Sequence, residues 1–144
     1  MKYLWQLPQH LLALMVILFY KLRNKIYKIE YNNDIINNKI YYITCITSSF
    51  SLGYYLFIRK NSTDITIKHE KGHSIQSLYT GLLYLFIVGI PSAVFNNLYG
   101  RIFKHNIPTS EYLKWYYSRW PEGGPNKWWH KYTADGLTNI DRKF

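Results

Sequence analysis

The pattern of apolar and polar positions changes along the chain, and its first part predicts a helix. An apolar run extends from Leu11 to Tyr20. A helix needs about twenty apolar residues to cross a bilayer, so this run predicts an interfacial or marginally spanning anchor helix over 1–25. Basic residues follow the run, whereas a signal peptide carries them before it. They are Lys21, Arg23, Lys25 and Lys28.

The next part of the chain has the short period of β-strands. Apolar and charged residues alternate over 26–31, and the segments 40–47 and 52–58 are rich in β-branched and aromatic residues. Runs of this length and composition are typical of half-buried strands. The pattern therefore predicts a small antiparallel sheet of two to three strands.

Two further segments have the composition of helices. The first begins near Thr63 or Asp64, both good N-terminal caps, and ends near Gly81. The second is apolar, with its centre at 82–90, and no charged residue occurs between Lys71 and Arg101. Its length is close to that of a membrane span, although Gly89 and Pro91 interrupt it. The alternative is a buried helical hairpin.

The C-terminal part predicts a short helix around 110–119, and an irregular tail follows from Pro121. The fold class expected from the whole pattern is α+β. It has an N-terminal apolar anchor helix, a small antiparallel sheet, a helix over the middle of the chain, an apolar helical segment and a short C-terminal helix.

Composition limits the possible partners. The 144 residues are 48% hydrophobic and carry a net charge of +10, with 15 Tyr and 5 Trp. Basic and aromatic residues suit an anionic membrane surface or a nucleic acid, and a bias towards AT-rich codons would give the same mixture. No nucleic-acid-binding motif is present, so membrane is the expected partner. The single cysteine, Cys45, excludes a disulfide framework and a zinc site built from CxxC.

One motif carries chemistry. His69-Glu70-Lys71-Gly72-His73 matches H-E-x-x-H, in which two histidines four positions apart lie on one face of a helix and can bind one metal ion. Glu70 lies about 100° around the helix from His69, where it can accept a proton from a water without binding the metal. Gly72 leaves space beside the second histidine. The alternative is a helix with two solvated histidines.

The sequence around this motif resembles that of small bacterial proteins with an HExGHxxQS core. Their similarity extends through Gly81-Leu82-Leu83-Tyr84-Leu85, Val88-Gly89-Ile90-Pro91-Ser92 and Pro121-Glu122. These proteins in turn resemble the membrane gluzincin zinc metallopeptidases, including the CAAX-prenyl-protease-like group. The resemblance implies a single zincin-like domain over 26–144, with Zn²⁺ bound by His69, His73 and Glu122 and with Glu70 as the catalytic base.

The third metal ligand stays open. Gluzincins carry an aspartate four positions after the ligand glutamate, whereas this chain has Asn126, which is a candidate partner for a ligand imidazole. Two glycines and a proline, which form helices poorly, lie between Glu122 and Asn126. Asp135 and His130 are therefore alternative third ligands.

The function expected from the sequence is that of a membrane-associated zinc metallopeptidase at a bacterial-type cell membrane, with a peptide or protein as substrate. The alternative is a metal-binding or membrane-interaction protein of the same fold that has lost catalysis. Binding of zinc without cleavage of peptides distinguishes the second from the first.

Overall fold

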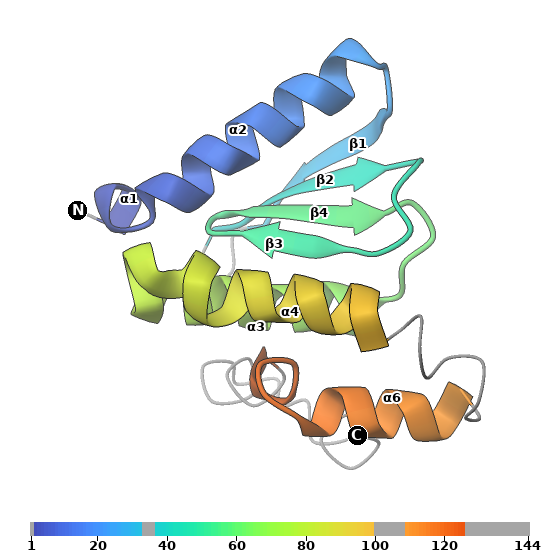
Figure 1. Cartoon of the computed structure of the whole chain (residues 1–144). Helices are drawn as coiled ribbons and strands as arrows, with labels where there is room; N and C mark the ends of the chain where they lie inside the picture. The colour runs from blue at the N-terminus through green and yellow to red at the C-terminus, as the bar shows by residue number, and fades with distance from the viewer. Residues whose placement is uncertain (1, 33–36, 100–108, 126–144) are drawn as a thin grey trace.

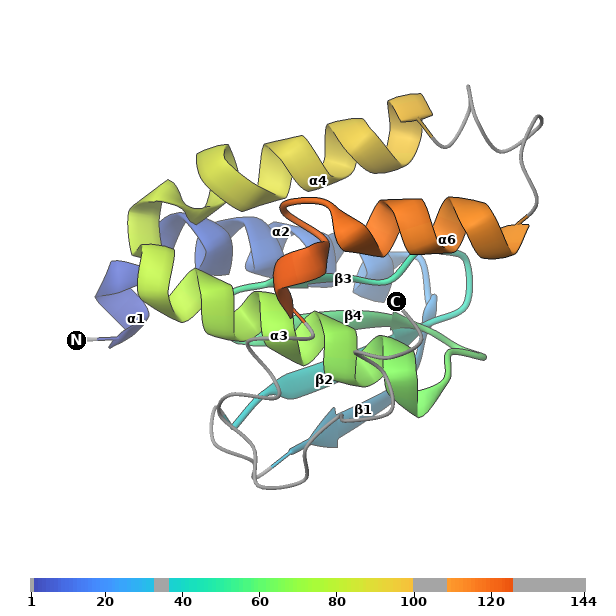
Figure 2. The same ribbon diagram turned by 90° about the horizontal axis from the view of Figure 1, so that it is seen from below.

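The fold is α+β, with a small mixed sheet between two layers of helices (Figure 1). The computed structural model describes residues 2–32, 37–99 and 109–125. Helix α2 covers one face of the sheet, and α3 covers the other (Figures 1 and 2). The elements are α1 (Lys2–Trp5), α2 (Leu7–Leu22), β1 (Ile26–Tyr31), β2 (Lys39–Ile43), β3 (Phe50–Leu52), β4 (Tyr55–Arg59), α3 (Asp64–Thr80), η1 (Gly81–Leu83), η2 (Leu85–Gly89), α4 (Ile90–Val94), η3 (Phe95–Tyr99) and α6 (Thr109–Ser118).

The sheet has four strands in the order β1-β2-β4-β3. The pairs β1–β2 and β3–β4 are antiparallel, but β2 and β4 are parallel. The prediction of an antiparallel sheet of two to three strands is therefore wrong in both number and direction. The segment predicted as one strand over 52–58 is interrupted by a turn at Gly53, whose φ of 60° is a left-handed conformation that favours glycine. The chain reverses at this turn, so that β3 pairs with β4 and lies at one edge of the sheet.

The two central strands, β2 and β4, are buried on both faces and alternate between them. Tyr41, Ile43 and Phe57 pack with Ala13 of α2, whereas Leu56 and Ile58 pack with Ile40 on the face covered by α3. This alternation follows from the two-residue period of a strand. Strands were correctly predicted in these segments. They were expected to be half-buried, but both faces of β2 and β4 are apolar and covered by helices.

The predicted N-terminal helix is present as two pieces. The short helix α1 ends before Gln6, and α2 begins at Leu7 with Pro8 in its first turn, a position where proline is tolerated. Helix α2 ends at Leu22, inside the segment over 1–25. The side chain of Ala13 is fully buried against the sheet, and this helix is therefore part of the core.

The apolar segment over 81–99 is an irregular helix. It passes from a 3-10 turn through π-helical turns at Leu85–Gly89 and Phe95–Tyr99, on either side of α4. Pro91 lacks an N–H group and lies in the first turn of α4, where proline is tolerated. Among the described residues, no single helix is both long and apolar enough to cross a membrane.

Candidate metal centre

Helix α3 carries the motif, and its bounds are those predicted from the caps. Thr63 occupies the N-cap position, and Gly81, with a φ of 53°, ends the helix. Every residue from His69 to Ser77 is buried, although most of them are polar. Because a buried polar group costs free energy unless it has a partner, this helix must be surrounded by hydrogen bonds.

Two serines supply hydrogen bonds that fix α3 in the fold. The amide of Asn38 donates to Ser74 Oγ over 2.8 Å, and Ser74 in turn donates to the carbonyl oxygen of Gly53. One turn further along, Gln6 donates to Ser77 Oγ over 2.8 Å. These bonds connect α3 to β2, to the turn between β3 and β4, and to the start of α2. The position of the motif is therefore determined by the whole fold.

The two histidines of the motif lie side by side on α3. Their ring centroids are 4.9 Å apart, and Tyr117 of α6 packs edge-on against His69 with its centroid 5.0 Å away. The prediction that the two imidazoles share one face of the helix is confirmed. Both rings are buried.

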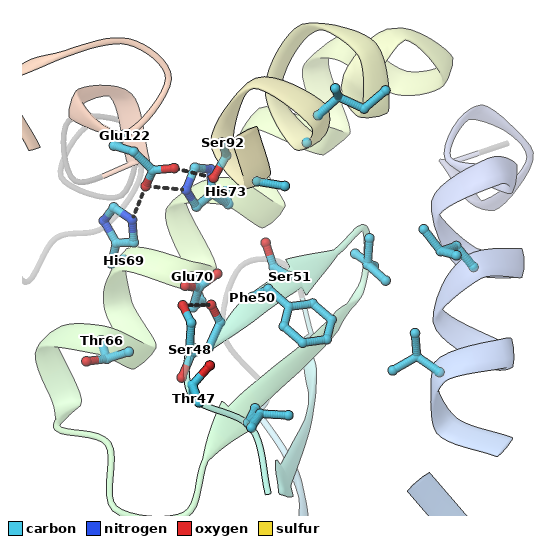
Figure 3. Close-up of a pocket in the computed structure, with 18 of the residues that line it drawn as sticks. Thr47, Ser48, Phe50, Ser51, Thr66, His69, Glu70, His73, Ser92 and Glu122 are labelled. Carbon is cyan, nitrogen blue, oxygen red and sulfur yellow. Dashed lines mark hydrogen bonds and ion pairs between the residues drawn. The ribbon is translucent and has the colours of Figure 1, made fainter. Parts of the chain in front are cut away.

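Glu122 reaches the histidines from the turn that follows α6. Its Oε2 atom is 3.0 Å from Nε2 of His69 and 3.3 Å from Nε2 of His73 (Figure 3). One ligand atom from each of the three residues lies within 4.8 Å of the others. The structure thus brings together the two histidines and the glutamate that the resemblance implied as ligands.

The approach of Glu122 depends on Gly72. A Cβ atom at Gly72 would overlap the carbonyl group and the α-carbon of Pro125. The absent side chain lets two main chains come into contact at this point. Residues 123–125, expected to form helix poorly, are in helical conformation here.

Polar neighbours orient the side chains of the candidate ligands. With the amide of Gln76 assigned in this orientation, Nδ1 of His73 donates to Gln76 Oε1 over 2.9 Å, which leaves the lone pair of Nε2 facing Glu122. Ser92 of α4 donates to Oε1 of Glu122, so Oε2 is the oxygen that faces both rings.

This arrangement calls for a positive charge at its centre. A neutral His73 that donates through Nδ1 has no hydrogen on Nε2, so its lone pair and the carboxylate oxygen of Glu122 would face each other without a proton. Burial raises the pKa of Glu122, but hydrogen bonds and positive charge from His69 and His73, when both rings carry a proton towards it, outweigh burial and hold this pKa well below its usual range. A proton on the histidines or a metal cation between the three groups satisfies this geometry.

Glu70 lies on the wall of the same cavity but outside the group of three. Burial raises its pKa to about 7, and the nearby carboxylate of Glu122 acts in the same direction, while His69 and Ser51 oppose the shift. In Figure 3 its side chain lies below the histidines, beside Ser48 and Ser51. This placement suits a residue that handles protons and does not bind the metal.

A cavity of about 840 Å³ opens beside these residues. Its polar end is formed by His69, Glu70, Glu122 and the segment Ser48–Ser51, which leads into the edge strand β3. Its apolar end is formed by α2 and by the helical segment that contains η2 and α4. The volume is in the range of sites that hold small molecules or a few residues of a peptide.

Three residues considered in the sequence lie outside the described part of the chain: Asn126, His130 and Asp135. The roles suggested for them therefore remain predictions.

Two other residues have partners that were not expected. Gln76 is buried against His73, and Ser92 donates to Glu122; neither contact was expected from the sequence. The position of Gln76 in the HExGHxxQS core was the available signal, whereas nothing local to Ser92 indicated its contact.

Comparisons of the chain with models of protein families, with curated proteins and with solved structures find no match. The resemblance to gluzincins remains a prediction.

Proposed function

We propose that the protein is a zinc-dependent hydrolase that cleaves peptide bonds. The observation that carries this proposal is the convergence of His69, His73 and Glu122 beside a cavity whose wall contains the buried Glu70. Two histidines and one glutamate are a ligand set of catalytic zinc sites, in which the fourth position is open to water or substrate. When bound, zinc acts as a Lewis acid and lowers the pKa of a coordinated water to about 7.

The donor set passes a test of fit that does not depend on any comparison. Oε2 of Glu122 and Nε2 of His73 are 3.3 Å apart, and a neutral His73 that donates through Nδ1 would turn a lone pair towards Oε2, a contact that a metal cation or a proton on the ring relieves. Gln76 fixes the tautomer of His73, as the outer partners of metal-binding histidines usually do. His69, His73 and Glu122 are thus the residues that would hold the zinc ion.

Glu70 is the proposed general base. A base is most effective when its pKa is close to the working pH, and burial brings the pKa of this carboxyl to about 7. Its side chain would take the proton of the attacking water and then deliver it to the leaving amine. A general base of this kind contributes about 10²–10⁴-fold to the rate.

The edge strand β3 favours a peptide as substrate. Residues Ser48–Leu52 line the cavity, and among the described strands β3 pairs with β4 alone. An edge strand presents unpaired main-chain groups to which an extended peptide can add as a further strand. A peptide bound in this way would pass along the cavity wall next to Glu70.

The proposal is tested by digestion of a mixed peptide library by the zinc-loaded protein, with the products read by mass spectrometry. The wild type is expected to cleave peptides, whereas Glu70→Gln should bind one zinc ion per chain and lose cleavage. Glu111→Gln is the matched control because Glu111 is an exposed glutamate on α6. Equal cleavage by wild type and Glu70→Gln would contradict the proposal. Binding of zinc without any cleavage would favour the alternative, a metal-binding protein without catalysis.

A further inference from the structure

Helix α2 is apolar on nearly all of its sides, but only one side is covered. Ala13 faces the sheet, whereas the opposite side carries Leu11, Met15, Leu18 and Leu22 at spacings of four, three and four. All four side chains are exposed, and Met15 is 68% exposed. A helix that is apolar all round is normally buried in a core or in a membrane.

A second exposed apolar surface lies across the cavity from α2. The segment over 82–98 has no charged residue, and its outward side chains include Phe86, which is 69% exposed. Leu12 of α2 and Ile90 of α4 are each more than a third exposed and also line the cavity. Both apolar surfaces therefore contribute residues to the wall of the cavity.

The charged residues of α2 and of the link between α2 and β1 are all basic, and within β1 Lys28 forms an ion pair with Glu30. No acidic residue occurs before Glu30. Four exposed basic residues lie at the end of α2 and just beyond it: Lys21, Arg23, Lys25 and Lys28. A second copy of this chain would bring its own charge of +10 to the same place, whereas anionic phospholipids would be attracted to it.

We propose that the exposed apolar side of α2, together with the outward side of the segment over 82–98, docks on a bilayer that contains anionic lipids. Helix α2 has 16 residues and a length of about 24 Å, which is shorter than the hydrocarbon core of a bilayer. It therefore lies in the interface and does not cross it. Docked in this way, the protein has on the membrane the two segments that line the apolar end of its cavity. This inference goes beyond the proposed hydrolysis and does not depend on it.

Flotation of the full chain with vesicles tests the docking surface. The probes are vesicles of phosphatidylcholine that contain phosphatidylglycerol, and vesicles of phosphatidylcholine alone. The wild type should float with the anionic vesicles and lose binding as salt is raised. The double variant Met15→Glu, Leu18→Glu should bind at least about tenfold more weakly, because each change places a carboxylate in the apolar side that meets the acyl chains.

A matched double variant, Ile29→Glu with Ile65→Glu, adds the same charge at exposed isoleucines on β1 and α3, and it should float almost as well as wild type. Lys21→Gln with Lys25→Gln removes two charges without touching the apolar side and should weaken binding about fivefold for each charge. Glu70→Gln should float like wild type, which separates this inference from the proposed hydrolysis.

Three results would overturn the proposal: no flotation of the wild type with anionic vesicles, equal flotation of the wild type and the Met15/Leu18 variant, or a dimer in solution that the same variant converts to a monomer. The third result, read by light scattering without vesicles, would assign the surface to a second copy of the chain.

Discussion

Gly72 of α3 lies against the main chain of Pro125, and no side chain fits between them. This contact sets how close the turn that carries Glu122 comes to α3. A residue that binds nothing thereby determines whether Glu122 can reach His69 and His73. The geometry of the proposed metal centre depends on this backbone contact as much as on the three candidate ligands.

Replacement of Gly72 by alanine is therefore expected to disrupt the metal centre. The added methyl group would push the segment around Pro125 away from α3 and withdraw Glu122 from the histidines. Overpacking of this kind costs about 1–3 kcal/mol of stability. We expect zinc affinity, measured by competition with a chelator, to fall at least about tenfold. Gly89→Ala is the control, since a Cβ there would meet its neighbours at ordinary contact distances. Wild-type affinity in Gly72→Ala would contradict the structure at this point.

Gln76 is expected to act as a positioning residue for His73. Gln76→Leu removes the acceptor for Nδ1 of His73 while it keeps much of the side-chain volume. Outer partners of this kind typically contribute 10–100-fold to metal affinity, so zinc should bind about 10–100-fold more weakly. Gln76→Glu keeps an acceptor oxygen and should restore most of the affinity. If Leu and Glu have the same effect, the role of Gln76 is packing alone.

Ser92 is expected to hold the carboxylate of Glu122 in its orientation. Its hydroxyl donates to Oε1, and hydrogen bonds to charged groups contribute about 1.5–3 kcal/mol. Ser92→Ala should lower zinc affinity about tenfold, and it should also lower the thermal melting point of the metal-free protein, because the buried Glu122 loses the same hydrogen bond there. Ser118→Ala, at an exposed serine at the end of α6, should change neither quantity. An unchanged zinc affinity in Ser92→Ala would remove this residue from the site.

Glu70 should make the metal-free protein less stable as pH rises. Burial raises the pKa of this carboxyl to about 7, compared with 4.5 as its ordinary value. A carboxyl that holds its proton more tightly in the folded chain than in the unfolded chain makes the fold less stable as pH rises between these two pKa values. The loss of folding stability is complete above about pH 7. In the metal-free protein at pH 8, Glu70→Gln should therefore be more stable than wild type by a few kcal/mol.

Thermal melts of the metal-free protein across pH give this measurement. The difference between Glu70→Gln and wild type should shrink towards zero as pH falls to about 4.5. Glu111→Gln should show no such difference, since Glu111 is exposed. A constant difference at all pH values would mean that the effect of Glu70→Gln does not come from ionisation.

Helices with clear ends could be predicted from the sequence. Thr63 and Gly81 indicated the correct ends of α3; Thr63 makes no side-chain capping hydrogen bond, whereas Gly81 ends the helix in a left-handed conformation. The shared face of His69 and His73 also followed from local geometry, since residues four apart in a helix are neighbours. The strand predicted over 26–31 was also correct, since β1 has these bounds.

Features that depend on distant contacts could not be predicted. The parallel pairing of β2 with β4 reflects how the chain returns after β3, which no local pattern records. Ser92 meets Glu122 only because α4 and the turn after α6 lie over the same cavity. The sequence left three possible third ligands open, and only Glu122 of these lies among the described residues, where the close approach of Pro125 to Gly72 accompanies its contact with the histidines.

The most direct test of the metal centre is X-ray absorption at the zinc edge of the full chain loaded with one equivalent of zinc. The account predicts two imidazole nitrogens at about 2.0–2.1 Å and carboxylate or water oxygens at about 2.0–2.2 Å in a four-coordinate shell. Glu122→Ala should lose one oxygen and most of the zinc affinity, while Glu70→Gln should leave the spectrum unchanged. A spectrum without imidazole, or one that is the same in Glu122→Ala and in the wild type, would contradict the proposal that His69, His73 and Glu122 hold the ion.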